Sequence, residues 1–155
     1  MKNNKKIKIH VKNNHWAPGS FPTDVEGEKN FTITKSHFNQ ALQNFPGINE
    51  KIEIFFDWDE ENFNSSISNS DILIAWNFPK SNLKKIAPKL KWIHCISAGV
   101  EHLIPLDWMF DNLVLTNNSG VHSKKAGEYG LMSVLMLQNH IPKIITNQKN
   151  KKFIS

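Results

Sequence analysis

The segment LKWIHCISAGVEHLIP, residues 90–105, constrains the fold of this chain more than any other stretch. Leu90 to Ile96 is almost entirely apolar, as a strand buried on both faces is, and it continues directly into the small residues Ser97 to Val100. A helical pattern then restarts at Glu101. Such a junction is typical of an open α/β sheet, in which ligands bind beyond the carboxyl ends of the strands.

The same alternation of strand-like and helix-like patterns runs along the whole chain. Period-two or fully apolar runs predict five strands, at residues 7–11, 51–56, 71–76, 92–96 and 113–116. Residues 13–24, which include two prolines and a glycine, are expected to form a loop. Helical spacing predicts helices at residues 38–45, 83–87 and 100–104, a short helix that begins near residue 59, and a helical turn that begins at residue 105. The longest predicted helix covers residues 124–139, with Pro142 beyond its end. Ser81 and Ser123 are the predicted N-caps of the helices at 83–87 and 124–139. We therefore predict an α/β fold, an open parallel sheet with helices on both faces.

The distribution of charged and apolar residues argues against a nucleic acid partner and against a membrane-spanning segment. The 155-residue chain has a formal net charge of +5, and all nineteen basic residues are lysines, which crowd both ends. Proteins that read phosphates or bases rely on arginine, so we expect no nucleic acid partner. The longest apolar stretch, Leu131 to Leu137, is far shorter than the ~20 residues of a membrane span, and no signal peptide is visible. The single cysteine, Cys95, suits a reducing compartment, so we predict a cytoplasmic protein that does not bind membranes.

The histidines give no metal signature. None of the seven stands four residues from another, and there is no cysteine cluster, so we predict no metal site. His94 and Cys95 are strand neighbours that point to opposite faces, which excludes a thiolate pair between them. His102 either approaches a ligand or solvates the short helix that contains it.

The loops after two strands carry aromatic residues. His15-Trp16 follows the first strand and Phe78-Pro79 follows the third, so both should lie at the same sheet edge as Ser97. They either line a substrate pocket there or cover the core.

Two long strings resemble the D-isomer-specific 2-hydroxyacid dehydrogenase family. LKWIHCISAGVEHLIPLDW resembles the family's strand-to-loop segment that approaches the substrate. LTNNSGVHSKKAGEYGLMSVLMLQNHIPKIITNQKNKKF resembles the strand, Asn-containing turn and long helix that follow. Residues 1–89 match the family's flavodoxin-like substrate domain in pattern only. The resemblance implies a substrate domain over residues 1–105 and the start of the interdomain and cofactor-domain region over residues 106–155.

The resemblance implies a small 2-keto or 2-hydroxy acid as substrate, with NAD or NADP as cofactor. In the family, main-chain amides at the positions of Ala98, Gly99 and Val100 hold the substrate carboxylate. Elementary chemistry agrees, because backbone N–H groups at a helix start bind anions and Gly99 permits close approach and unusual dihedral angles. The alternative is a tight strand-to-helix turn with no ligand. The family's segment from Asn117 to Ala126 runs near the cofactor cleft, which makes Ala126 a candidate cofactor contact.

The departures from the family pattern bear on activity. The family's catalytic Arg, Glu and His cannot be placed here, the chain has no arginine, and no G-x-G-x-x-G motif occurs. We therefore assign no catalytic residue and expect the chain to be the amino-terminal part of a dehydrogenase, with no cofactor bound by this chain alone. The alternative is a catalytically inactive fragment that acts as a carboxylate-binding or protein-interaction module.

The predicted helix at residues 124–139 is apolar on more than one face. The residues from Leu131 to Leu137 are too broadly apolar for a helix that packs on one side only. In the family this helix lies in the dimer interface. We therefore expect a homodimer through the helix around Leu131 to Leu137, or a separate chain that supplies the Rossmann domain.

Overall fold

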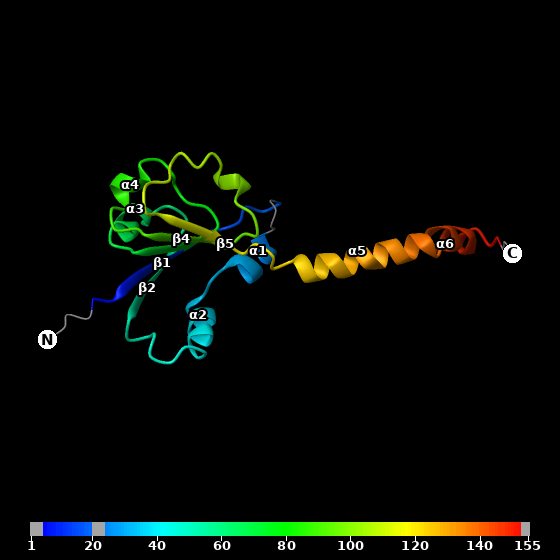
Figure 1. Ribbon diagram of the computed structural model, residues 1–155, viewed down its shortest axis with the longest axis horizontal. Helices are drawn as coiled ribbons and strands as arrows, with labels where there is room; N and C mark the ends of the chain where they lie inside the picture. The colour runs from blue at the N-terminus through cyan, green and yellow to red at the C-terminus, as the bar shows by residue number, and fades with distance from the viewer. Residues whose placement is uncertain (1–4, 20–23, 153–155) are drawn as a thin grey trace. The chain divides into compact units, whose positions relative to one another are not determined.

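The computed structural model describes residues 5–19 and 24–152 (Figure 1). The chain divides into two compact units between Asn118 and Ser119. The second unit contains α5 (Ser123–Gln138) and α6 (Ile141–Lys149). The first contains, in chain order, β1 (Ile7–Asn13), α1 (Asp24–Phe31), α2 (Lys35–Leu42), β2 (Ile52–Trp58), α3 (Phe63–Ile67), β3 (Ile72–Ala75), α4 (Leu83–Ile86), β4 (Trp92–Cys95), the 3-10 turn η1 (Glu101–Leu103) and β5 (Val114–Asn117).

The five strands form one parallel sheet in the order β2-β1-β3-β4-β5. This is the flavodoxin-like order, and it confirms the predicted α/β fold. The strand order reverses at β1, because β2 lies on one side of β1 and β3 on the other. In folds of this class the crevice beyond the carboxyl ends of the two strands at the reversal binds ligands. That crevice lies beyond β1 and β3.

The main hydrophobic core lies on one face of the sheet. Leu73, Ala75, Ile93 and Cys95 of β3 and β4 point to this face and are at most 1% exposed. Burying one Leu or Ile side chain stabilises a fold by ~1.5–3 kcal/mol, so this packing can hold together strands of only four residues. The helices and loops complete the core with Phe63, Ile67, Phe78, Leu83, Ala87, Leu90, Leu103 and Leu113.

Helices α1 and α2 are associated with the opposite face. Phe38 of α2 packs edge-on against Phe56 of β2, with ring centroids 6.3 Å apart. The side-chain amide of Asn13, at the end of β1, accepts a hydrogen bond from the Ile33 N–H at 2.9 Å and donates one to the Ile33 carbonyl at 3.0 Å. Helices therefore lie on both faces, as the alternating pattern predicts.

Several helix boundaries differ from the sequence prediction. Helix α1 was not predicted, because its sequence DVEGEKNF has only two large apolar residues and no helical period. The predicted helix at residues 100–104 is a single 3-10 turn, and the predicted turn from residue 105 is not helical. Helix α6 was also missed, since Pro142 stands in its first turn, where a proline leaves no intrahelical hydrogen bond unmade.

The two predicted serine caps are wrong. The N-cap position of α4 is held by Asn82 in a left-handed conformation with φ of 58°, and that of α5 by His122. The Ser123 hydroxyl donates instead to the Gly120 carbonyl at 2.7 Å, which closes the preceding turn. A glycine at 120 suits this turn, because its φ is +86°.

Neither helix of the second unit contains a buried residue. The large apolar side chains of α5 are exposed, with Leu131 at 62% and Leu137 at 66%. Ile144 and Ile145 of α6 are each 54% exposed.

No helix in the described part of the chain is long and apolar enough to cross a membrane.

Candidate functional site

The segment after β4 presents main-chain donors and conceals its main-chain acceptors. All five carbonyls from Ile96 to Val100 accept a hydrogen bond within the first unit. The N–H groups of Ala98, Gly99 and Val100 have no acceptor among the described residues. Since Ala98 is exposed and Gly99 and Val100 are half-buried, ligands in solution can reach this row of donors. We call residues 98–100 the amide cradle.

Residues from β5 and the turn itself hold the carbonyls. The Asn118 side chain donates to the Ile96 carbonyl at 2.9 Å, and the Asn118 main-chain N–H donates to the Ser97 carbonyl at 2.9 Å. The side-chain amide of Asn117 donates to the Ala98 carbonyl at 3.0 Å. The Ser97 hydroxyl donates to the Gly99 carbonyl, and Leu103 donates to Val100 at 2.9 Å. The carbonyl oxygens of this turn are therefore all hydrogen-bonded, and the N–H groups of the cradle donate to no described residue.

Glu101 lies directly beside Gly99. A Cβ atom added at position 99 would clash with the Glu101 carboxylate and would lie 2.8 Å from its Cδ. Gly99 does not adopt a left-handed φ, so it does not use the unusual dihedral angles that a glycine permits. The absence of a side chain at 99 instead leaves room for the Glu101 carboxylate.

His102 connects the cradle to the neighbouring strand. Its Nε2 lies 2.7 Å from the Trp76 carbonyl and 3.7 Å from the Cys95 sulfur. Because a carbonyl only accepts, Nε2 must carry the proton and cannot act as a base toward the thiol. Cys95 is fully buried, and its sulfur also lies 2.9 Å from the Ser97 hydroxyl. We therefore assign this cysteine a structural role in the turn.

Four rings gather beyond the carboxyl ends of β1 and β3. Trp76 is the centre: its ring contacts Trp16 edge-on at 5.7 Å, Phe31 edge-on at 5.0 Å and His102 in a stacked arrangement at 5.8 Å. We call these four residues the aromatic cluster. Trp16, Phe31 and Trp76 are half-buried and His102 is exposed. Sequence reasoning placed Trp16 and His102 at this edge but gave Trp76 no role.

Phe78 lies in the hydrophobic core and does not line a pocket at this edge of the sheet. It is 2% exposed and belongs to the hydrophobic core, where it packs edge-on against Trp108 with ring centroids 5.3 Å apart. Of the alternatives for this loop, Phe78 covers the core.

A polar pair, His15 and Asp59, lies beyond the ends of β1 and β2. The His15 N–H donates to Asp59 at 2.9 Å, the His15 ring Nδ1 contacts the other carboxylate oxygen, and the ring stacks on Trp58 at 4.5 Å. Burial raises the pKa of Asp59, but the hydrogen bonds from His15 outweigh it and hold this pKa below its ordinary value. Strand β3 separates β1 from β4, so this pair and the cradle follow strands that are not neighbours in the sheet.

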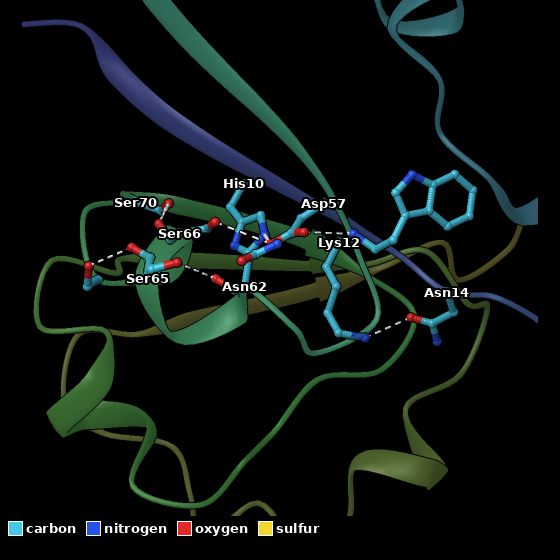
Figure 2. A network of polar contacts seen from close by, with 10 residues as sticks. His10, Lys12, Asn14, Asp57, Asn62, Ser65, Ser66 and Ser70 are labelled. Carbon is cyan, nitrogen blue, oxygen red and sulfur yellow. Dashed lines mark hydrogen bonds and ion pairs between the residues drawn. The ribbon is translucent and has the colours of Figure 1, made fainter.

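Buried titratable groups lie between β1, β2 and α3 (Figure 2). His10 is fully buried, and its Nε2 lies 3.5 Å from Asp57, which also accepts a hydrogen bond from Ser66 at 3.2 Å. Burial lowers the pKa of His10, against the opposing effect of the Asp57 carboxylate. Lys12 is 4% exposed and donates to Asn14 at 2.8 Å, and burial lowers the pKa of its amine.

The predicted cofactor contact lies in the other unit. Ala126 is an exposed residue in the first turns of α5, whereas the cradle belongs to the first unit. A Cβ atom added at Gly127 or Gly130 would meet nothing within 4 Å, so neither glycine marks a close backbone approach. Within residues 5–19 and 24–152, no group of three or more His, Cys, Asp or Glu side chains is arranged to hold a metal ion.

Comparison with known proteins gives no family assignment. No family model, no curated protein and no solved structure matches this chain. The site is therefore interpreted from its own geometry, as an amide cradle bordered by an aromatic cluster at the carboxyl edge of a flavodoxin-like sheet.

Proposed function

We propose that the first unit binds the carboxylate of a small 2-keto or 2-hydroxy acid through the amide cradle. One observation carries this proposal: three consecutive N–H groups lack an acceptor among the described residues, while every carbonyl around them is occupied. Backbone N–H groups that donate to no described residue favour an anion, and hydrogen bonds to a carboxylate are stronger than those to a neutral group. The Glu101 carboxylate lies beside Gly99, so an anion in the cradle displaces it.

We further propose that the chain is the substrate-binding part of an NAD(P)-dependent D-2-hydroxyacid dehydrogenase. The support is the resemblance of residues 90–153 to that family, together with a donor row at the positions that hold the carboxylate there. The sequence has no G-x-G-x-x-G fingerprint, and Gly127 and Gly130 stand within α5. Hydride transfer needs the cofactor held against the substrate, so the nicotinamide site belongs to a second domain.

The second candidate is a binding or interaction module without catalysis. The exposed apolar side chains of α5 favour it, because contiguous exposed apolar surface usually marks an interaction site. On this alternative the chain holds a carboxylate weakly and its second unit contacts another protein or a second copy.

An NMR titration of the full chain with pyruvate tests the cradle. We expect millimolar binding that shifts the amide signals of residues 98–100, because few contacts are available. Gly99→Val should abolish these shifts, since its side chain occupies the space beside Glu101, whereas Ala98→Ser should retain them because the donors are main-chain groups. Pyruvamide, which lacks the negative charge, is the matched ligand control. Equal binding of pyruvate by Gly99→Val and the parent chain, or equal shifts with pyruvamide, would remove the carboxylate site.

A turnover assay tests an expectation that the two candidates share. The chain alone should show no NADH-dependent reduction of glyoxylate, pyruvate or hydroxypyruvate, because it lacks the family's arginine and glycine fingerprint. Turnover clearly above a mock-purified control would contradict this expectation and would place a cofactor site within these 155 residues.

A further inference from the structure

We propose that the aromatic cluster selects acids with an aromatic side chain, so that the ligand of the amide cradle is an aryl-substituted 2-hydroxy or 2-keto acid. This inference rests on the proposed carboxylate site and names the class of ligand for it. The observation that carries it is the position of the cluster, which adjoins the cradle and is separate from the core.

The cluster is tied to the cradle by main-chain and ring contacts. His102 follows Val100 by two residues, so the 3.8 Å spacing of Cα atoms keeps their Cα atoms within about 8 Å. The His102 ring is fixed by its hydrogen bond to the Trp76 carbonyl at 2.7 Å and stacks on the Trp76 ring. A small acid whose carboxylate lies on the cradle therefore has its substituent near Trp76.

These rings lie outside the buried hydrophobic core. None of the four belongs to the core cluster, which Phe78 and Trp108 already cover at the end of β3. Trp16 and Trp76 instead follow the two strands that flank the reversal of strand order, where this fold class binds ligands. Rings left half-buried at this position gain further burial when a flat apolar group covers them.

The cluster also contains a buried polar group that has no hydrogen-bond partner in the part of the chain that the structure describes. The indole Nε1 of Trp16 is buried and has no hydrogen-bond acceptor among the described residues. A buried donor without an acceptor is unfavourable, so a ligand that brings oxygen atoms to this edge and shifts the ring relieves it. The indole N–H signal of Trp16 is therefore a direct reporter for occupation of the cluster.

The geometry of the rings suits an aryl group better than a branched aliphatic one. Trp76 meets Trp16 edge-on at 90° and Phe31 edge-on at 80°, so its ring already takes part in the perpendicular contacts that aromatic pairs prefer. An added ring extends the same packing, whereas an aliphatic group contributes area only.

The test compares two hydroxy acids that differ only by a phenyl group. D-lactate and D-3-phenyllactate are titrated into the full chain, and the amide signals of residues 98–100 are followed together with the indole signals. We expect both acids to shift the cradle amides and phenyllactate to bind at least fivefold tighter, with an added shift of the Trp16 and Trp76 indoles. Trp76→Leu should bring the ratio of the two affinities close to one, mainly by weakening the binding of phenyllactate, and Trp76→Phe should retain part of the preference.

Trp92→Leu is the matched control, because Trp92 is 40% exposed on β4 and contacts no member of the cluster, and it should leave the ratio unchanged. Equal affinity for the two acids, with cradle shifts present, would overturn this inference and leave the carboxylate site standing. No cradle shift with either acid would overturn the proposed function itself. A preference for phenyllactate that survives in Trp76→Leu would place the aryl group elsewhere and also overturn the inference.

Discussion

The two units of this chain contrast in how they use apolar residues. The first unit has a buried core in which Leu73, Ile93 and Leu103 are fully inaccessible, although other large apolar side chains such as Phe45 and Ile104 are exposed. The second unit contains no buried residue in either helix, although α5 is rich in Leu, Met and Val. Its lysines also outnumber its acidic residues by six to one, whereas the first unit has equal numbers over residues 1–118. The contrast teaches that apolar content alone does not predict burial, because burial also needs a second surface.

The largest expected difference between the units concerns truncation of a leucine. Leu73→Ala in β3 should lower the free energy of unfolding by ~2–5 kcal/mol, because it leaves a cavity in the core. Leu131→Ala in α5 should change it by less than ~0.5 kcal/mol, because the side chain is 62% exposed. Chemical denaturation of both variants measures this. A similar cost for the two would mean that α5 is covered in solution.

The next prediction tests whether a second copy covers α5. Leu131→Lys combined with Leu135→Lys should increase the monomer fraction in sedimentation, because two charges would be buried in any interface through this helix. Gln138→Lys with Asn139→Lys adds the same charge at exposed polar positions and is the control. If the parent chain already sediments as a monomer at all concentrations, the predicted dimer through Leu131 to Leu137 is wrong.

A smaller effect is expected at the amino end of the sheet in the first unit. Burial raises the pKa of Asp71, but hydrogen bonds from the Lys8 N–H and the Lys91 amine outweigh it, and the pKa lies below its ordinary value. The stability from this carboxylate is therefore present above the unfolded-state pKa of about 4 and is lost as the pH falls through the lower folded-state value. Asp71→Asn should cost roughly 1 kcal/mol at pH 7 in denaturation experiments. The cost should shrink toward pH 2, and a cost independent of pH would contradict this account.

The smallest expected effect is a pH dependence from His10. Burial lowers its pKa, so the unfolded chain takes up a proton more readily than the folded one. Stability from the neutral ring is complete above the unfolded-state pKa of about 6.5 and falls as the pH decreases below it. His10→Leu should flatten the stability profile between pH 6.5 and 5, and His37→Leu, at an exposed position of α2, should not. An unchanged slope in His10→Leu would assign the acid sensitivity to another group.

The sequence predicts the elements whose apolar residues form a buried run or recur with the period of a strand or a helix. The five strands and α5 were found because their burial or helical spacing is visible in the residues themselves. Helix α1 was missed because its sequence has too few apolar residues to show a period, and α6 because Pro142 reads as a helix end. The caps were misassigned because serine and asparagine side chains can serve several turn geometries, and only the backbone decides among them.

The candidate site could be located from the sequence but not described. The change from apolar to small residues placed the cradle at residues 98–100. The sequence could not show that the carbonyls of this turn are hydrogen-bonded and its N–H groups are not. That arrangement depends on Asn117 and Asn118, which are some twenty residues away in the chain. The role of Trp76 was hidden for the same reason, since the rings that meet it come from three other segments.

The hydrogen bonds that occupy the carbonyls of the cradle have a consequence for how this site tolerates sequence change. The donors belong to the main chain, so the exposed position 98 can accept many side chains without altering what is offered to an anion, whereas Val100 packs against the core. Asn117 and Asn118 have no such freedom, because shorter or charged side chains would release the carbonyls that they hold. On the proposed function, selection for ligand binding would therefore act on Gly99 and on the end of β5, whose residues hold the carbonyls, while position 98 is free to change.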